Sequence, residues 1–191
     1  MGTRMILATI IVGACTLLVA LAQESKPTPP LSDEEATKLI AGYQKCKKAN
    51  EKPIQVYRIF SELCRSMTAT EQRLFQQDLH GENYITVYVN ETGREEFFEK
   101  TKPRFSAGSV IVKEKLAKPG ENPDLLTVMV KRDRGYDPAN GDWQFLTFDG
   151  KGAKVTSGGN VKNCQECHER RKDVDFVFRA YLSADVRLQL K

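Results

Sequence analysis

The chain has 191 residues, of which 40% are hydrophobic and 28% charged, so it is long enough for one globular domain and too apolar for a disordered protein. Lys and Arg exceed Asp and Glu by 29 − 25 = 4, and no basic block is interleaved with aromatic residues, which argues against nucleic-acid binding. Only one stretch is apolar enough to cross a bilayer, which excludes a polytopic membrane protein.

Residues 1–22 have the layout of a secretory signal peptide. Arg4 gives a positive start, residues 5–21 are apolar and uncharged, and Ala20-Leu21-Ala22 matches a processing site. A retained anchor helix and lipidation at Cys15 are the alternatives. All three place the remaining residues outside the cytoplasm, so we expect a periplasmic or secreted protein. With cleavage, the mature chain has no membrane span.

The segment that follows begins with a linker and continues as a helical region. Residues 23–31 form the linker, because their Pro-rich end cannot hold a helix or a sheet. Residues 32–79 are predicted to be an N-terminal helical segment, which Ser32 and Glu35 begin with a capping box. Its predicted helices span, in chain order, residues 33–48, 54–64 and 70–78.

From residue 80 the apolar residues alternate with a period of two, which indicates strands. The predicted strands span residues 84–89, 109–115, 125–131 and 143–148, with a fifth at 175–182. A helix at 91–100 separates the first two, and short turns rich in Pro, Asn, Asp and Gly join the others. This order predicts an α+β fold, an antiparallel β-sheet with N-terminal and flanking helices.

Cys164-Gln165-Glu166-Cys167-His168 is C-x-x-C-H, the attachment sequence of a c-type haem. Two thiols on one short turn can form thioethers to the two vinyl groups of the porphyrin, and His168 is then held beneath the ring as an iron ligand. A zinc site would need further ligands, and a Cys164–Cys167 disulfide would leave His168 unexplained. We therefore predict haem c as the cofactor and residues 80–191 as the haem domain.

Two more cysteines lie before this domain. In an oxidising compartment, Cys46 and Cys64 are expected to form a disulfide, and the alternative is a pair of buried thiols.

The candidates for the sixth iron ligand are few. After the signal peptide only Met67, Met129 and His80 could serve. Met129 lies in an alternating strand and is expected to be a core residue, whereas His80 precedes a glycine and is expected in an exposed loop. The pattern thus favours an open axial position, for which phenylalanines such as Phe145 would form an apolar distal wall.

Four segments in this order resemble the cytochrome P-460 family, which includes the cytochromes c′-beta. They are 87–90 (VYVN), 105–114 (FSAGSVIVKE), 141–145 (GDWQF) and the C-x-x-C-H motif, and the resemblance covers roughly residues 80–182. It implies a mainly antiparallel-sheet c-haem protein, commonly a homodimer, with five-coordinate iron on His168.

The same resemblance suggests a role for a lysine. Members called P-460 oxidise hydroxylamine and carry a lysine joined covalently to the haem ring, whereas the c′-beta members bind small gases such as nitric oxide. Lys113 matches the motif position best and Lys115 is its rival, while a lysine on an exposed strand is otherwise simply solvated. The enzymes also use a distal carboxylate as a base, for which this chain offers Asp142 and then Gln144, an amide that cannot act as a base.

Three functions therefore remain open. The first is a hydroxylamine oxidoreductase-type haem enzyme, the second a nitric oxide binding protein of the c′-beta type, and the third a six-coordinate electron-transfer cytochrome with a redox partner protein. The basic residues Arg170, Arg171 and Lys172 could dock an acidic partner or pair with haem propionates, and the alternative is a solvated basic turn.

Overall fold

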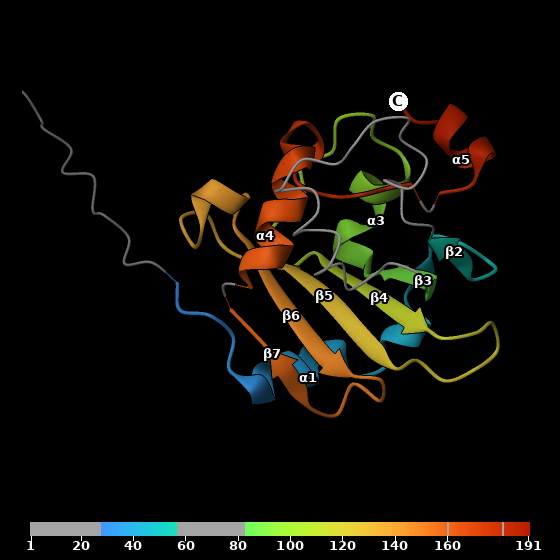
Figure 1. Cartoon of the computed structure of the whole chain (residues 1–191). Coiled ribbons are helices and arrows are strands. Elements are labelled where there is room, and N and C mark those ends of the chain that lie inside the picture. The colour runs from blue at the N-terminus through green and yellow to red at the C-terminus, as the bar shows by residue number, and fades with distance from the viewer. Residues whose placement is uncertain (1–27, 57–82, 160, 181) are drawn as a thin grey trace, which may run out of the picture.

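A computed structural model describes residues 28–56, 83–159, 161–180 and 182–191. The predicted signal peptide, the predicted helix at 70–78 and most of that at 54–64 lie outside these residues. The described strands form one antiparallel sheet, and helices cover both of its faces (Figure 1). The predicted α+β class with an antiparallel sheet is therefore confirmed.

The described part of the sheet has seven strands in the order β1-β3-β4-β5-β6-β7, with β2 pairing beside β1 on β3. Every pairing is antiparallel, and the central pairs extend over six or seven residues. The strands are β1 Lys47–Lys48, β2 Ile54–Val56, β3 Asn83–Val89, β4 Val110–Leu116, β5 Leu125–Lys131, β6 Trp143–Asp149 and β7 Val155–Ser157.

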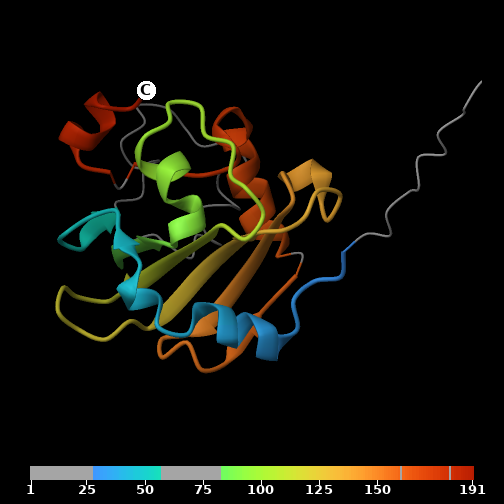
Figure 2. The ribbon, with the colours of Figure 1, turned by 180° about the vertical axis from the view of Figure 1, so that it is seen from behind.

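Helices pack on opposite faces of this sheet, with α1 on one face and α3 and α4 on the other (Figures 1 and 2). Within the described ranges, none of the helices combines the length and apolar character needed to cross a membrane. The helices are α1 Asp33–Ile40, η1 Tyr43–Lys45, α3 Glu91–Phe98, η3 Pro138–Asn140, α4 Lys162–His168, η4 Glu169–Val174 and α5 Ala184–Leu188.

The alternation along the strands divides the core into two clusters. Ile111, Met129 and Phe145 pack with α3 and α4 on one face, which we call the α4 face. Val112 and Leu146, one residue further along their strands, pack with α1 on the other face. Because side chains alternate along a strand, Lys113 lies on the α4 face with Ile111. Because both faces of the sheet are covered, the side chains of the central strands are buried along most of their length, including polar ones such as Lys113 and Gln144.

The N-terminal segment is less helical than predicted. The helix predicted over 33–48 ends at Ile40, because Gly42 takes a left-handed backbone with φ of 74° and turns the chain. Lys47–Lys48 then pairs with β3 as a short strand, and Ile54–Val56, predicted as the start of a helix, is also a strand on β3. Pairing with a neighbouring strand has overridden the local pattern here.

The fifth strand predicted at 175–182 does not form among its described residues. Asp175 and Phe176 both have left-handed backbones, with φ of 52° and 65°, and an extended strand cannot continue through such a pair. The alternation of apolar residues after Asp175 is instead explained by packing in the core, where Phe176 and Val177 are buried. β7, α4 and α5 were not predicted.

Candidate functional site

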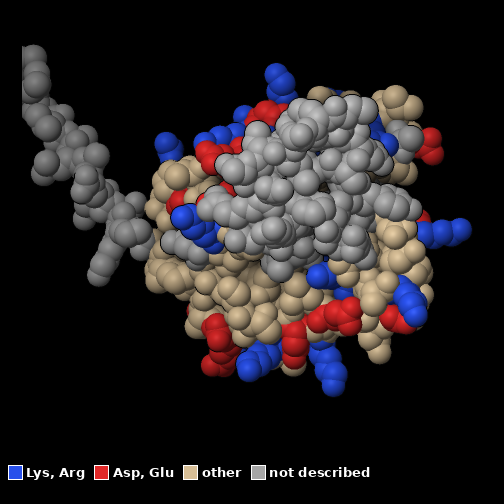
Figure 3. Space-filling model, viewed as in Figure 1, with Lys and Arg blue, Asp and Glu red and all other residues tan. Residues whose placement is uncertain are grey.

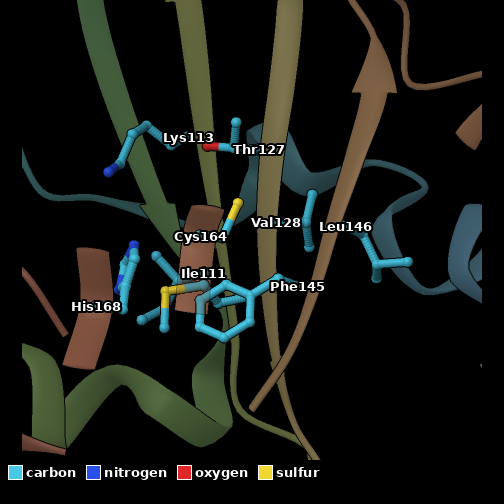
Figure 4. A pocket seen from close by; sticks show the side chains of 9 residues that line it. Ile111, Lys113, Thr127, Val128, Phe145, Leu146, Cys164 and His168 are labelled. Atoms are coloured by element: carbon cyan, nitrogen blue, oxygen red, sulfur yellow. The ribbon is translucent and has the colours of Figure 1, made fainter. Parts of the chain in front are cut away.

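A cavity lies between α4 and the α4 face of β4, β5 and β6 (Figure 4). Its volume is about 20 Å³, enough for a water-sized molecule. The described residues that line it are Ile111, Lys113, Thr127, Val128, Met129, Phe145, Leu146, Cys164 and His168. Two of the three motif residues and the lysine suggested by the family resemblance therefore meet at one place.

The C-x-x-C-H motif forms the last five residues of α4. Cys164 and Cys167 are three residues apart and thus lie on one side of the helix, and His168 is its last residue. Both cysteines are half-buried and present as thiols. The amide of Gln165, between the cysteines, donates to the carboxylate of Asp137 at 2.8 Å, which ties α4 to the loop before β6.

The His168 side chain is buried among aromatic rings. It is 7% exposed, and the rings of Phe145 and Phe178 each lie with their centroids 5.1 Å from that of the imidazole. Its Nδ1 is 2.7 Å from the carbonyl oxygen of Phe176, and because a carbonyl can only accept, Nδ1 carries the proton. The lone pair is therefore on Nε2.

Electrostatics favour the same neutral form of the imidazole. Burial, followed by the positive charge of Lys113, lowers the pKa of His168 to about 3, although the hydrogen bond to Phe176 acts in the opposite direction. At neutral pH the ring is therefore uncharged with an available Nε2 lone pair, which is the state that binds a metal ion.

The thiol of Cys164 is held in its protonated form. Burial, followed by the neighbouring Cys167, raises its pKa to about 11, although the charge of Lys113 acts in the opposite direction. The cation of Lys113 thus influences both Cys164 and His168.

Lys113 is 8% exposed, so the alternative of a solvated lysine on an exposed strand is wrong. In Figure 4 its amino group and the His168 ring lie on the same side of the cavity. The rival Lys115 is half-buried on the same strand and is not among the described lining residues.

Neither residue considered for the distal base faces this cavity. The carboxylate of Asp142 accepts from the backbone N–H groups of Gly135 and Asp137 at 3.2 and 2.9 Å, within its own loop. Gln144 is fully buried on the opposite face of the sheet, where its amide oxygen accepts from the backbone N–H of Leu31 at 3.0 Å.

Met129 is the one candidate for the sixth ligand within the described residues. It is 8% exposed, which confirms that it is a core residue, and it also lines the cavity. Met67 and His80 lie outside the described residues.

The other sequence predictions concern the surface and Cys46. Burial raises the pKa of the half-buried Cys46 thiol, and since Cys64 lies outside the described residues the disulfide stays a prediction. In the basic turn after the motif, Lys172 pairs with Glu169 at 2.7 Å and Arg171 lies 3.9 Å from Asp173. These two ion pairs agree with a solvated basic turn. On the coloured part of the face seen in Figure 3, basic and acidic side chains are likewise interspersed.

The donor set fits a c-type haem. It offers two thiols on one helical turn followed by a neutral histidine with its lone pair on Nε2, the combination that thioether attachment and iron ligation require. No cluster of three or more His, Cys, Asp or Glu able to hold a metal ion occurs in the described part of the chain. The cavity itself, at about 20 Å³, is smaller than a porphyrin.

Comparison with known families agrees with this donor set. The model of the family described as Cytochrome P460 matches residues 55–179, about two thirds of the chain. The chain belongs to the cytochrome P460 family. Membership implies a haem cofactor. The match begins at β2 rather than at the predicted domain boundary near residue 80, and no curated protein matches the chain at a significant level.

Some parts of this cytochrome P460 site were missed by sequence reasoning. Thr127 lies opposite Lys113 in the register of β4 and β5, so the alternation of the predicted strands contains the signal for it. Phe176 accepts the His168 hydrogen bond through its backbone carbonyl oxygen. This role was missed because the sequence pattern does not show which backbone group a left-handed turn places beside the histidine. Phe178 was assigned to a strand that does not form.

Proposed function

We propose that this protein is an extracytoplasmic mono-haem c-type cytochrome that binds or redox-converts small nitrogen ligands, such as hydroxylamine and nitric oxide, at an open haem position. The observation that carries the proposal is the convergence of Cys164, His168 and Lys113 on one apolar cavity, where burial keeps the imidazole neutral and the Phe176 carbonyl holds its proton on Nδ1. In this proposal residues 1–22 are removed on export and residues 80–191 form the haem domain.

Each motif residue has one role. Cys164 and Cys167 would tether the haem through thioethers, and His168 would ligate the iron through Nε2. The bound haem would supply the ligand-binding and electron-transfer chemistry. Phe176 keeps the proton on Nδ1, and the rings of Phe145 and Phe178 exclude water from the histidine.

Replacing the histidine tests the iron ligand. We expect His168→Ala, expressed in a host that matures c-type cytochromes, to retain covalently bound haem but to lose the wild-type ferrous absorption spectrum, and added imidazole to restore part of it. A ferrous spectrum identical to that of the wild type would remove His168 from the iron. Denaturing gels stained for haem peroxidase activity report the covalent attachment independently.

For Lys113 we propose a covalent bond from Nζ to a carbon atom of the haem ring, as the family resemblance implies. The bond would replace one N–H and one ring C–H bond with a loss of two protons and two electrons, so its formation would need a two-electron oxidant such as peroxide. The proposal is supported by the burial of Lys113 and by its place in the lining of the same cavity as Cys164 and His168. Proteolysis and mass spectrometry of the holoprotein should give a haem-bearing species that joins the α4 peptide to the β4 peptide.

Two lysine variants on the same strand make this test specific. Lys113→Met should give haem on the α4 peptide alone, together with an ordinary c-type absorption spectrum, whereas Lys115→Met should leave the joined species intact. Wild-type haem found only on the α4 peptide would show that the cross-link does not form. The chain would then be closer to the c′-beta members, which bind nitric oxide.

A second candidate function, electron transfer by a six-coordinate haem, is favoured by one observation. Met129 lines the same cavity as His168, and a methionine thioether is a common sixth ligand in electron-transfer cytochromes. If the sixth coordination position of the iron is open, nitric oxide should change the ferrous absorption spectrum of the wild type. A low-spin spectrum that ignores nitric oxide, and becomes high-spin in Met129→Leu, would favour electron transfer.

The partners of this protein are also proposed. A redox partner protein would exchange electrons with the haem, and the family resemblance implies a homodimer, which light scattering on the holoprotein would test. Asp142 is given no role as a base, because its carboxylate is occupied by two backbone N–H groups. Turnover of hydroxylamine with an added electron acceptor separates the oxidoreductase from the ligand-binding protein.

A further inference from the structure

The carbonyl oxygen that holds His168 belongs to an unusual piece of backbone. Asp175 and Phe176 are consecutive residues with φ of 52° and 65°, and neither is a glycine. L-residues rarely take this left-handed conformation, and it persists only where the surrounding structure enforces it. The Phe176 carbonyl accepts from His168 Nδ1–H at 2.7 Å, so the orientation of the imidazole depends on this strained dipeptide.

Three groups from the neighbouring strands and loop hold Asp175 in place. Lys131 Nζ lies 2.7 Å from each of its carboxylate oxygens, and the backbone N–H of Phe105 donates to the same carboxylate at 2.8 Å. The indole N–H of Trp143 donates to the Asp175 carbonyl oxygen at 2.9 Å. The side chains of the ion pair are only 12% and 9% exposed, so each charge depends on its partner for stabilisation.

Phe176 is restrained from another side by Gly141. A Cβ atom at Gly141 would lie 2.5 Å from Cδ2 of the Phe176 ring, which is closer than real Cβ contacts. The loop before β6 thus fits directly against the side chains of Phe176 and Asp175.

We propose that the buried Lys131–Asp175 ion pair is a positioning device for His168, which holds the left-handed dipeptide so that the Phe176 carbonyl keeps its hydrogen bond to Nδ1–H. The proposal rests on the proposed haem site, in which His168 binds iron. A strong hydrogen bond at Nδ1 fixes the ring orientation and increases the basicity of Nε2. A more basic ligand stabilises the ferric state, so the ion pair keeps the reduction potential of the haem low.

The test uses variants of the holoprotein that separate position from charge. Asp175→Asn breaks the ion pair but leaves an amide that tolerates a left-handed backbone and can still accept from Phe105. Lys131→Met combined with Asp175→Asn removes both charges and leaves the net charge unchanged. Asp173→Asn is the matched control, because it makes the same substitution two residues away at a side chain that is 68% exposed.

The double variant is expected to retain stoichiometric covalent haem with a reduction potential above that of the wild type. In the five-coordinate ferrous state, the iron–histidine stretching band in resonance Raman should also move to lower frequency. Asp175→Asn should shift both in the same direction, and Asp173→Asn should shift neither. If the ion pair only stabilises the fold, its removal would lower the denaturation midpoint and leave the reduction potential and the Raman band unchanged.

If the haem-loaded double variant has the reduction potential and the Raman band of the wild type, this inference is overturned but the proposed haem site is not. Wild-type protein that matures without covalent haem would instead overturn the proposed function. If the charge variants fail to fold, Asp175→Glu decides, because it keeps both charges but adds a methylene group that displaces the carboxylate from Lys131 and from the Phe105 N–H. A raised potential in haem-loaded Asp175→Glu supports the positioning role, and a wild-type potential rejects it.

Discussion

Lys113 and Glu114 are neighbours on β4 whose buried side chains face opposite sides of the sheet. Lys113 lines the cavity next to α4, whereas the carboxylate of Glu114 accepts from the hydroxyl groups of Tyr43 and Tyr88 at 2.8 and 3.3 Å. The two tyrosine rings meet edge to face, with centroids 5.2 Å apart. This acidic cluster is thus separated from the proposed haem site by the sheet itself.

The tyrosines of this cluster predict a loss of stability at alkaline pH. Burial, followed by the charge of Glu114, raises the pKa of Tyr88 to about 12, and burial with the Glu114 hydrogen bond raises the pKa of Tyr43 as well. A tyrosine in the unfolded chain titrates near about pH 10, so above that pH the unfolded state binds fewer protons than the folded state. The free energy of unfolding should therefore be unaffected by these groups below about pH 10 and fall from about pH 10 to about 12.

Guanidinium unfolding at a series of pH values measures this fall. In Tyr88→Phe one of the two titrating groups is removed, so the decrease in unfolding free energy across the alkaline range should be shallower than in the wild type. An equally steep decrease would mean that Tyr88 is not the group responsible.

Among the elements, α3 shows how one side chain can connect a helix to the sheet. The amide oxygen of Asn90 accepts from the backbone N–H of Gly93, which caps the helix, and from that of Val110 at the start of β4, at 3.1 and 2.9 Å. Its amide nitrogen donates to the carbonyl of Gly108 at 2.8 Å. In contrast, Ser32 caps α1 through a capping box with Glu35 at the exposed surface.

This difference predicts unequal effects of two cap substitutions. Ser32→Ala should lower the free energy of unfolding by about 1 kcal/mol, the usual effect of losing an N-cap. Asn90→Ala should lower it by about 2–4 kcal/mol, because it also leaves backbone groups at β4 without partners. Denaturant unfolding measures both, and Asn90→Asp should recover part of the loss by restoring the acceptor. Equal losses in the two alanine variants would contradict the connecting role of Asn90.

Other elements show where local patterns failed. The four central strands were predicted because the alternation of apolar residues and the turn residues between strands are local signals. The helix α3 was predicted from its own local sequence in the same way. The alternation after Asp175 resembles a strand, but Lys131, Trp143 and His168 hold that segment in left-handed turns from elsewhere in the chain. Likewise Lys47–Lys48 has no strand pattern and becomes one only because β3 lies beside it.

Over the whole molecule, the proposed haem site lies where α4 meets the α4 face of the sheet. Cys164 and Val161 on this side pack against the cluster that contains Phe97, Trp143 and Val177. A cofactor attached here would add apolar contacts to one of the two core clusters only, the one that contains the cavity. The stability of the fold should therefore depend on haem attachment.

Removal of both attachment thiols tests this dependence. Cys164→Ser combined with Cys167→Ser should yield protein without covalent haem and with an unfolding free energy lower by about 3 kcal/mol or more, because a group that binds only the folded chain stabilises it. Cys46→Ser, the same substitution on the opposite side of the sheet, should keep its haem. Haem staining and guanidinium unfolding measure the two effects, and equal stability with and without haem would contradict the prediction.

By itself, the sequence determined the chemistry of the site and the kind of fold. C-x-x-C-H is contiguous, so Cys164, Cys167 and His168 could be named without coordinates, and the strand alternation predicted the antiparallel sheet. Only the tertiary structure decided that Lys113 is buried beside them, because strand periodicity gives the side of a residue but not what covers that side. It also decided which group holds His168, since the Phe176 carbonyl is set by contacts from β5, β6 and the loop before β4 that no local pattern records.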